Sequence, residues 1–366
     1  MEQKKCALIA MSGGVDSSVA AYLTLRQGLQ CIGGTMRLFT NAVLADGQES
    51  SCCSLDDTED ARSVAYRLGM RFYAFNSSAE FREKVMDKFV RCYEQGNTPN
   101  PCIDCNRYLK FDHLLQKALI LGCDYVVTGH YARIVKKDGR YLLYKATDAA
   151  KDQTYFLYTL TQHQLAHTLF PLGELTKTEV RQIAEEQGFL NARKRDSQDI
   201  CFVPDGDYMA FLERYTGKSY SGGAFLDQSG KVVGQHRGAV AYTLGQRKGL
   251  GLAMGQPVYV CAKDMERNTI TVGPNEALFS RSLRANDWNW ISFPALTKPI
   301  RVKAKARSRM TEQQATVYPE ENGFARVEFD EPQRAITPGQ AVVLYDGDQV
   351  IGGGTINEVL AETEVP

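Results

Sequence analysis

A short loop of small residues near the start of the chain has the composition of a phosphate-binding loop. The apolar run CALIAM (residues 6–11) ends at SGGVDSS (12–18), and a helix-compatible sequence follows directly. Backbone N–H groups in such a loop, with the first turn of a helix, form a cradle for phosphate oxygens. The loop lacks the lysine of GxxxxGK[ST] and carries Asp16, which predicts a Mg²⁺ ion between this carboxylate and the phosphates. The alternative is an ordinary strand–helix turn with an N-cap. A lone SGG would favour that alternative, whereas the seven-residue SGGVDSS favours the phosphate-binding loop.

A second group of reactive residues lies in TPNPCIDCNR (98–107). Two prolines restrain the chain before a predicted helix over about 106–121, and Asn106 or Asp104 is a candidate N-cap. Cys105 is therefore expected at a helix N-terminus, where the partial positive charge favours the thiolate, as do Arg107 and Lys110. Half of a zinc site is the alternative, but the sequence has no matching second CxxC and only five histidines.

A further cysteine, Cys201, lies in DSQDICF (196–202) and follows the basic run 193–195. Alone, it is best interpreted as a small buried residue on a short strand. Together with Cys105 it suggests sulfur chemistry, because two thiols can carry sulfur as a persulfide and then resolve as a disulfide.

Cations alternate with small or apolar residues near the C-terminus, at Arg301, Lys303, Lys305, Arg307 and Arg309. At the period of a strand these five side chains fall on one face, which predicts contacts with the phosphates of an RNA. A solvated strand face is the alternative. Residues 246–249 (QRKG) form a weaker second patch.

The elements that must position these residues follow from periodicity and turn signals. Over residues 1–200, strand-like runs at 6–11, 30–36, 71–75 and 123–128 are separated by helical runs, which predicts a parallel, doubly wound sheet. Residues 137–140 (KDGR) predict a hairpin after this alternation, and helices dominate 152–190.

From about residue 217 the sequence has the short β runs and turn residues of a barrel or sandwich, as at 238–243, 258–261, 269–272 and 341–345. The segment 280–300, which holds both tryptophans, is expected to separate two small β domains. The predicted domains are 1–205, 206–285 and 286–366.

Composition is that of a soluble globular protein with two or three domains. The chain has 366 residues, with 43 Lys+Arg and 43 Asp+Glu, so overall charge gives no sign of nucleic-acid binding. No run of 18 apolar residues and no signal-peptide pattern is present, so we expect a cytoplasmic protein with no membrane contact. Ten cysteines in such a chain suggest metal, redox or sulfur chemistry.

Six ordered motifs resemble those of the tRNA-specific 2-thiouridylases. They are SGGVDSS, TPNPCIDCNRYLKF (98–111), TGHYAR (128–133), KDQTYFL (151–157), SQDICF (197–202) and TLGQRKGLG (243–251). The first is similar to the PP-loop of ATP pyrophosphatases, which adenylate an oxygen and release pyrophosphate. The resemblance runs almost end to end. It implies an α/β PP-loop domain with a doubly wound parallel sheet (adenine nucleotide alpha hydrolase-like), followed by two small β-barrel domains.

The resemblance also implies site residues. Those expected at ATP are Ala10, Met11, Ser12, Gly13, Gly14, Val15, Asp16, Ser17, Met36 and Gly129, with Asp16 also expected at the metal. Cys105 is implied as the nucleophile and Cys201 as the persulfide carrier. Asn100, Pro101 and Cys102 are expected beside the target base, and some family members have aspartate where this chain has Cys102. Those expected to bind tRNA are His130, Lys151, Asp152, Gln153, Arg307, Ser308 and Gln340.

The implied reaction fits the residue types. A uracil carbonyl oxygen is a poor leaving group, and adenylation of the wobble uridine 2-oxygen by ATP turns it into AMP, which leaves readily. That step requires a held pyrophosphate and Mg²⁺, and the next requires an anionic sulfur. His130 is either a proton shuttle or a structural histidine. The implied partners are tRNA and a persulfide donor, either a cysteine desulfurase or a sulfur-relay protein, and a monomer is expected.

Three alternatives remain on the sequence alone. The first is another PP-loop ligase acting on a small molecule, and the paired cysteines disfavour it. The second is an iron–sulfur thiolase that uses Cys102, Cys105 and Cys201 as cluster ligands. The third is an RNA-binding module with a decayed nucleotide site, which the intact loop disfavours. Cys52 and Cys53 have no assigned role.

Overall fold

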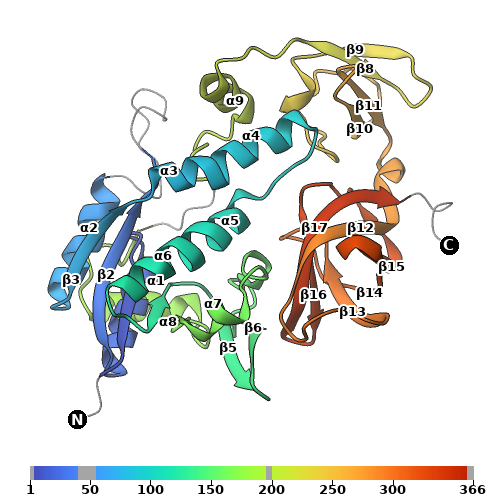
Figure 1. The fold of residues 1–366 in the computed structure, drawn as a ribbon. Coiled ribbons are helices and arrows are strands. Elements are labelled where there is room, and N and C mark those ends of the chain that lie inside the picture. Colours follow the sequence, from blue (N-terminus) through green and yellow to red (C-terminus); the bar gives the residue numbers. More distant parts are fainter. Residues whose placement is uncertain (1–3, 40–54, 195–199, 361–366) are drawn as a thin grey trace. The chain divides into compact units, whose positions relative to one another are not determined.

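The structure, a computed structural model, describes residues 4–39, 55–194 and 200–360 (Figure 1). These form two compact units. The first comprises Met1–Met86, Pro101–Gly206 and Asp348–Val350, and the second comprises Asp87–Asn100, Asp207–Gly347 and Ile351–Pro366. Residues 52, 53 and 195–199 of the motifs above lie outside the described residues.

The first unit is built on a five-stranded sheet in the order β3-β2-β1-β4-β7. Its strands are β1 (Cys6–Ala10), β2 (Gln30–Arg37), β3 (Arg71–Asn76), β4 (Tyr125–Val127) and β7 (Thr168–Leu169). Every neighbouring pair is parallel, which confirms the predicted doubly wound sheet. Strand order reverses between β1 and β4, the place where ligands bind in such sheets, at the carboxyl ends of the strands.

Helices cover both faces of this sheet. They are α1 (Val15–Arg26), α2 (Leu55–Arg67), α3 (Ser78–Phe81), α5 (Pro101–Asp104), α6 (Leu114–Ile120), α7 (Gln162–Ala166) and α8 (Lys177–Glu186), with π-helical turns at Arg82–Met86 and Cys105–His113 and a 3₁₀ turn at Thr154–Phe156. Ala7 and Ile9 of β1 pack in a buried cluster with α1, α2 and α8, whereas Leu8 packs with α6. The alternation of β1 therefore divides its side chains between two helical layers.

Three local predictions can be compared with this unit. The hairpin at 137–140 is confirmed, because β5 (Ala132–Lys137) pairs with β6 (Arg140–Lys145) in antiparallel register. Helices dominate 152–190 as predicted, at Thr154–Phe156, α7 and α8. The short strand β7 was not predicted, since two residues are too few to show a period. The helix predicted to begin near residue 106 begins at Pro101, whose fixed φ suits the first turn.

The second unit contains two helices and a four-stranded mixed sheet. These are α4 (Asp87–Glu94), α9 (Tyr208–Thr216), β8 (Gly223–Leu226), β9 (Val232–His236), β10 (Tyr259–Asp264) and β11 (Thr269–Gly273), with the sheet in the order β10-β11-β8-β9. The strand predicted at 238–243 is wrong. A 3₁₀ turn occupies Ala239–Ala241, because the Gly238 N–H donates to His236 Nδ1 at 3.1 Å and turns the chain.

A closed six-stranded barrel completes this unit. Its strands are β12 (Phe279–Trp290), β13 (Ile300–Lys305), β14 (Gln313–Pro319), β15 (Ala325–Arg334), β16 (Ala341–Asp346) and β17 (Gln349–Leu360), with 3₁₀ turns at Asn275–Leu278 and Glu321–Gly323. Pairing of β12 with β17 closes the ring and removes exposed strand edges.

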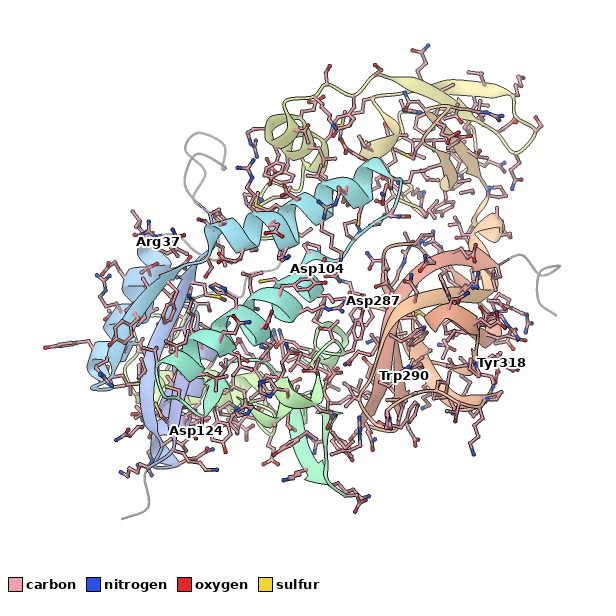
Figure 2. All side chains as sticks on the ribbon, viewed as in Figure 1. Arg37, Asp104, Asp124, Asp287, Trp290 and Tyr318 are labelled. Atoms are coloured by element: carbon pink, nitrogen blue, oxygen red, sulfur yellow. The ribbon has the colours of Figure 1, made fainter. Side chains whose placement is uncertain are left out.

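Both tryptophans belong to the barrel and not to a connecting segment. Trp288 and Trp290 lie on β12, with ring centroids 4.7 Å apart and planes 4° from parallel, and both pack against the barrel core. Figure 2 shows Trp290 on the barrel. The expectation that 280–300 separates two domains is therefore wrong, and a boundary between 285 and 286 falls inside β12. Among the described residues, no helix combines the length and apolarity needed to cross a bilayer.

Candidate active site

A cavity of about 340 Å³ lies in the first unit, at the carboxyl ends of β1, β2 and β4. The predicted nucleotide residues on its wall are Ala10, Met11, Ser12, Asp16, Ser17, Met36 and Gly129. Pro101, Cys102, Cys105 and Cys201 line the same cavity, as do His130 and Gln153. Residues predicted from separate motifs thus share one site, while Gly13, Gly14 and Val15 are not among the residues that line it.

Two glycines let the loop after β1 pack closely against its neighbours. Gly13 is in the left-handed region at φ +74°, and a Cβ there would lie 2.3 Å from the Asp57 carbonyl oxygen. A Cβ on Gly129 would lie 2.7 Å from the carbonyl carbon of Asp16. Only glycine fits these positions without a shift of the backbone. Val15 is buried in the core of the first unit, and this packing anchors the loop and the start of α1.

Polar contacts also hold the loop in place. Asn191 Nδ2 donates to the Gly13 carbonyl oxygen and to Ser18 Oγ, each at 2.9 Å. Ser17 Oγ donates to the Gly14 carbonyl oxygen at 2.9 Å and accepts the Ser12 N–H at 3.3 Å. Gly14 is the N-cap of α1 and has no capping side chain among the described residues, so the first turn of α1 keeps N–H donors for a ligand. This cradle fits a phosphate group.

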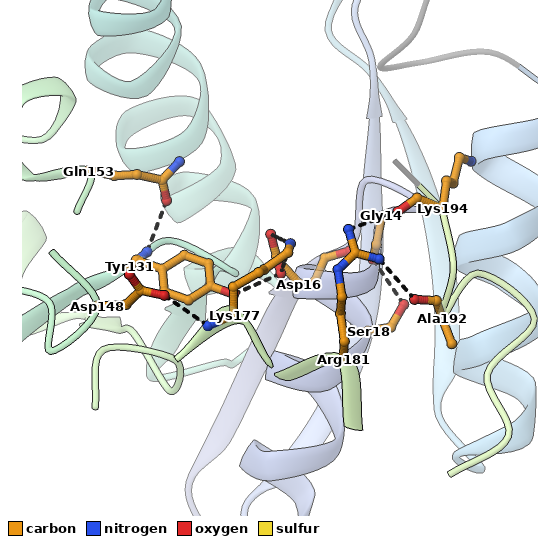
Figure 3. Close-up of polar contacts among 11 residues, drawn as sticks. Gly14, Asp16, Ser18, Tyr131, Asp148, Gln153, Lys177, Arg181, Ala192 and Lys194 are labelled. Carbon is orange, nitrogen blue, oxygen red and sulfur yellow. Dashed lines mark hydrogen bonds and ion pairs between the residues drawn. The ribbon is translucent and has the colours of Figure 1, made fainter. Parts of the chain in front are cut away.

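Asp16 is held by two side chains from other elements (Figure 3). Lys177 Nζ, at the start of α8, donates to Oδ1 at 2.7 Å and to Oδ2 at 2.8 Å, and the Tyr131 hydroxyl donates to Oδ1 at 3.0 Å. Asp16 is the only carboxylate among the described residues that line the cavity. Mg²⁺ usually binds one or two carboxylates, water and substrate phosphates, so a single aspartate beside a phosphate cradle fits that ion.

The three cysteines on the cavity come from two segments. Cys102 is exposed in the first turn of the helix that begins at Pro101, and Cys105 lies one turn further, where the π-helical turn starts. The expectation that Cys105 is at the helix N-terminus is therefore wrong, and the favourable end effect falls on Cys102 instead. Cys201 is half-buried beside Phe202, whose ring packs edge-on against Phe81 at 5.7 Å.

These cysteines do not form a metal-binding group in the described part of the chain. No three His, Cys, Asp or Glu side chains among the described residues lie together as metal ligands. Asp104, a candidate N-cap on the sequence alone, is buried at the end of α5 (Figure 2).

Family models cover the chain in three consecutive segments. The model described as a tRNA methyl transferase HUP domain matches residues 5–205, that described as a tRNA methyl transferase PRC-barrel domain matches 209–274, and that described as an aminomethyltransferase beta-barrel domain matches 280–356. The ranges agree with a sheet-based nucleotide domain followed by two β domains.

Relatives match over nearly the whole length. The tRNA-specific 2-thiouridylase MnmA of Symbiobacterium thermophilum is 53% identical over 97% of this chain and 93% of its own. That of Halothermothrix orenii is 51% identical over 96% and 98%, and that of Clostridium acetobutylicum is 50% identical over 96% and 99%. The chain belongs to the tRNA-specific 2-thiouridylase family. A 4-thiouridine synthetase–RNA complex with bound ATP is a far more distant match, at 19% identity and a TM-score of 0.34 over 55% of this chain and 45% of that one.

In this member of the family, two of the side chains assigned to tRNA have partners inside the first unit. Asp152 accepts the Ala146 N–H at 3.1 Å and the Thr154 hydroxyl at 2.7 Å, and Gln153 Oε1 accepts the Tyr131 N–H at 2.9 Å. Both side chains therefore shape the loop that carries half-buried Lys151. Their assignment as RNA contacts stays a prediction.

The tRNA-assigned residues of the second unit hold that unit together as well. Gln340 Nε2 donates to the Thr98 carbonyl oxygen at 2.7 Å, which fixes the segment leading to Asn100. Arg307 is half-buried and donates to the Leu244 carbonyl oxygen at 3.2 Å and to Thr337 Oγ1. Ser308 follows it in the same turn.

The predicted face of five cations on one strand is wrong. β13 ends at Lys305, so Arg307 and Arg309 lie in the turn beyond it. Arg301 is paired with Asp330 of the barrel, at 2.6 Å from Nη1 to Oδ1. The sequence pattern could not show this acid, since it lies on β15. Lys303 is the exposed cation that remains at the centre of the strand.

His130 occupies a buried position at the cavity wall. One ring nitrogen, Nδ1, lies 2.7 Å from Thr128 Oγ1, and the ring packs against Phe111 and Phe170 at 5.7 and 5.9 Å. Burial, aided by the charge of Lys110, lowers the pKa of His130 well below its usual value. The imidazole is therefore neutral at neutral pH and suits a structural role or a hydrogen bond to a ligand better than a positive contact to phosphate.

This burial predicts acid sensitivity that His130→Gln should reduce. Below pH of about 6.5 the unfolded histidine binds a proton that the folded one does not, so stability falls as pH falls through that value. Urea denaturation at pH 5.0 to 7.5 gives the free energy of unfolding at each pH. As pH falls, this free energy should decrease more steeply for the wild type than for the variant, by up to about 1.4 kcal/mol per pH unit. Equal slopes for both proteins contradict this prediction.

Sequence reasoning missed three residues that build the site: Lys177, Tyr131 and Asn191. In the sequence, Lys177 and Tyr131 lie 161 and 115 positions from their partner Asp16. Asn191 lies 178 and 173 positions from its partners Gly13 and Ser18. One local signal was available for Lys177. It directly follows the N-cap Thr176, at a helix end where cations are disfavoured.

Proposed function

We propose that this enzyme, a tRNA sulfurtransferase by its family, converts the wobble uridine of tRNA to 2-thiouridine with ATP and a cysteine persulfide. The observation that carries the proposal is the shared cavity, which is lined by the phosphate-binding loop and by Cys105 and Cys201. Adenylation followed by sulfur transfer requires an ATP-binding site and a pair of thiols at the same cavity.

In the first step the uridine 2-oxygen attacks the α-phosphorus of ATP, and pyrophosphate leaves. The loop after β1 and the first turn of α1 would hold the phosphates, and Met36 and Gly129 would lie at the adenosine. Asp16 would hold Mg²⁺, which supplies charge neutralisation for the departing pyrophosphate.

In the second step the terminal sulfur of a Cys201 persulfide attacks C2 of the adenylated base, and AMP leaves. The Cys105 thiolate then attacks the Cys201 sulfur, which releases 2-thiouridine and forms a Cys105–Cys201 disulfide. A thiol reductant and the persulfide donor, a cysteine desulfurase or a sulfur-relay protein, restore the starting state.

The tRNA must deliver its uridine into the cavity, so the base leaves its stack as in other base-modifying enzymes. Asn100, Pro101 and Cys102 are proposed beside this base, and His130 at the cavity is proposed to contact the RNA. The proposed RNA contacts elsewhere are Lys151, Asp152, Gln153, Arg307, Ser308 and Gln340. A monomer suffices for this scheme.

Mass spectrometry of tRNA nucleosides tests the proposal. Incubation of the enzyme with unmodified tRNA, ATP, Mg²⁺ and a persulfide donor should yield 2-thiouridine, and omission of ATP should abolish it. Pyrophosphate release should depend on tRNA. Release driven by a small amine without tRNA, and no thiolated nucleoside, overturn the proposal in favour of a small-molecule ligase.

A further inference from the structure

We propose that Lys177 is the phosphate-binding cation that the loop itself lacks, and that it pairs with Asp16 until ATP binds. On binding, the ammonium group passes from the carboxylate to the pyrophosphate part of ATP. The inference rests on the proposed use of ATP at this cavity and adds a binding residue to it.

The ion pair lies at the edge of the cavity. Lys177 Nζ contacts both carboxylate oxygens of Asp16, and its side chain is 12% exposed, whereas that of Asp16 is 31% exposed and lines the cavity (Figure 3). A phosphate group that approaches Asp16 therefore comes within reach of an ammonium group on a flexible four-carbon stem. Tyr131 donates to Oδ1, which keeps the carboxylate turned toward the same place.

Lys177 occupies a helix position that is unfavourable for a cation. It is the first residue of α8, where the partial positive charge of the helix end disfavours a cation. Thr176 and Glu179 form a capping box there, and the Lys177 N–H donates to Asp148 Oδ2 at 2.9 Å. The backbone at the start of α8 is thereby anchored, because the N–H groups of Thr176, Lys177 and Glu179 all have side-chain acceptors. The anchored backbone holds the Lys177 ammonium group beside Asp16.

Charge explains why an exchange is needed. A carboxylate beside phosphates repels them, and the Lys177 pair neutralises Asp16 before ligand arrives. Once Mg²⁺ binds Asp16, the carboxylate is neutralised by the metal instead. The ammonium can then donate charge-assisted hydrogen bonds to phosphate oxygens, which are stronger than neutral ones.

Calorimetric titration of the full chain with ATP, pyrophosphate and AMP, each with Mg²⁺, tests the inference. Lys177→Gln should weaken ATP and pyrophosphate binding at least tenfold and leave AMP binding within twofold of the wild type. Thr176→Ala is the matched control, because it removes the helix cap but keeps the ammonium group, and it should bind pyrophosphate like the wild type. Thermal unfolding of each variant shows that it is folded.

Pyrophosphate binding without metal gives a second readout of opposite sign. Asp16→Asn breaks the ion pair with Lys177 and removes the repelling carboxylate, so metal-free pyrophosphate should bind more tightly than to the wild type. The double variant Asp16→Asn/Lys177→Gln, which lacks both the carboxylate and the ammonium group, should lose that gain.

The outcomes separate this inference from the proposed function. A wild type that binds neither ATP nor pyrophosphate overturns the proposed function itself. A wild type that binds both, with Lys177→Gln binding pyrophosphate equally well or losing AMP to the same extent, overturns only the role of Lys177. A gain in Asp16→Asn that persists in the double variant also overturns it.

Discussion

Replacement of Cys201 by serine is expected to reduce thiolation of tRNA by about a thousandfold or more, to the limit of detection. A hydroxyl group cannot carry a persulfide, so the transferable sulfur has no attachment site. The side chain is half-buried and serine has nearly the same shape, so folding should be retained. Nucleoside mass spectrometry gives the product, and filter binding of labelled tRNA should give a dissociation constant within twofold of the wild type.

Cys31→Ser is the matched control for this experiment. Cys31 lies on β2 in the same unit, where burial raises the pKa of its thiol to about 11, and its Sγ donates to the Leu29 carbonyl oxygen at 3.8 Å. It should thiolate tRNA at the wild-type rate. Thiolation by Cys201→Ser at more than a tenth of the wild-type rate contradicts the assignment of the persulfide to Cys201.

Replacement of Gly13 by alanine is expected to destabilise the first unit and to abolish ATP binding. Alanine pays for the left-handed backbone at φ +74° with about 1–2 kcal/mol, and its Cβ, 2.3 Å from the Asp57 carbonyl oxygen, forces a backbone shift that costs about 1–3 kcal/mol more. Since Asn191 also binds the Gly13 carbonyl oxygen, the shift displaces the phosphate cradle. Urea denaturation and equilibrium dialysis with ATP measure the two effects.

Gly28→Ala separates backbone strain from close packing. Gly28 has φ +83°, and a Cβ there would meet nothing within 4 Å. It should cost only about 1–2 kcal/mol and leave ATP affinity unchanged. If both variants lose the same stability and both bind ATP normally, close approach of the loop to α2 is not what fixes the cradle.

The local parts of the fold were predictable because they depend on short-range patterns. The parallel sheet followed from strand-like runs at the spacing of intervening helices, and the β runs predicted at 258–261, 269–272 and 341–345 coincide with β10, β11 and β16. The errors have local causes too. A two-residue strand such as β7 has no period, and the β-rich run at 238–243 turns because Gly238 bonds to His236.

Side-chain roles were less predictable than elements. Arg307 has the type and spacing of an RNA-binding residue, yet it is half-buried and bonded to Leu244 and Thr337. Arg301 meets Asp330 from a neighbouring strand. Partners of this kind depend on which strands become neighbours, and a single sequence does not state that order.

The sequence by itself determined which groups are proposed to do the chemistry: a loop for phosphate with Asp16, and thiols at Cys105 and Cys201. Residue type and local spacing suffice for that, because phosphate cradles and thiolates are local features. Only the tertiary structure decided that these groups share a cavity, and that Lys177 and Asn191 complete the loop from more than 150 positions away. The reason is strand order. Because β4 lies parallel and beside β1, the loops that follow the carboxyl ends of these two strands lie next to each other.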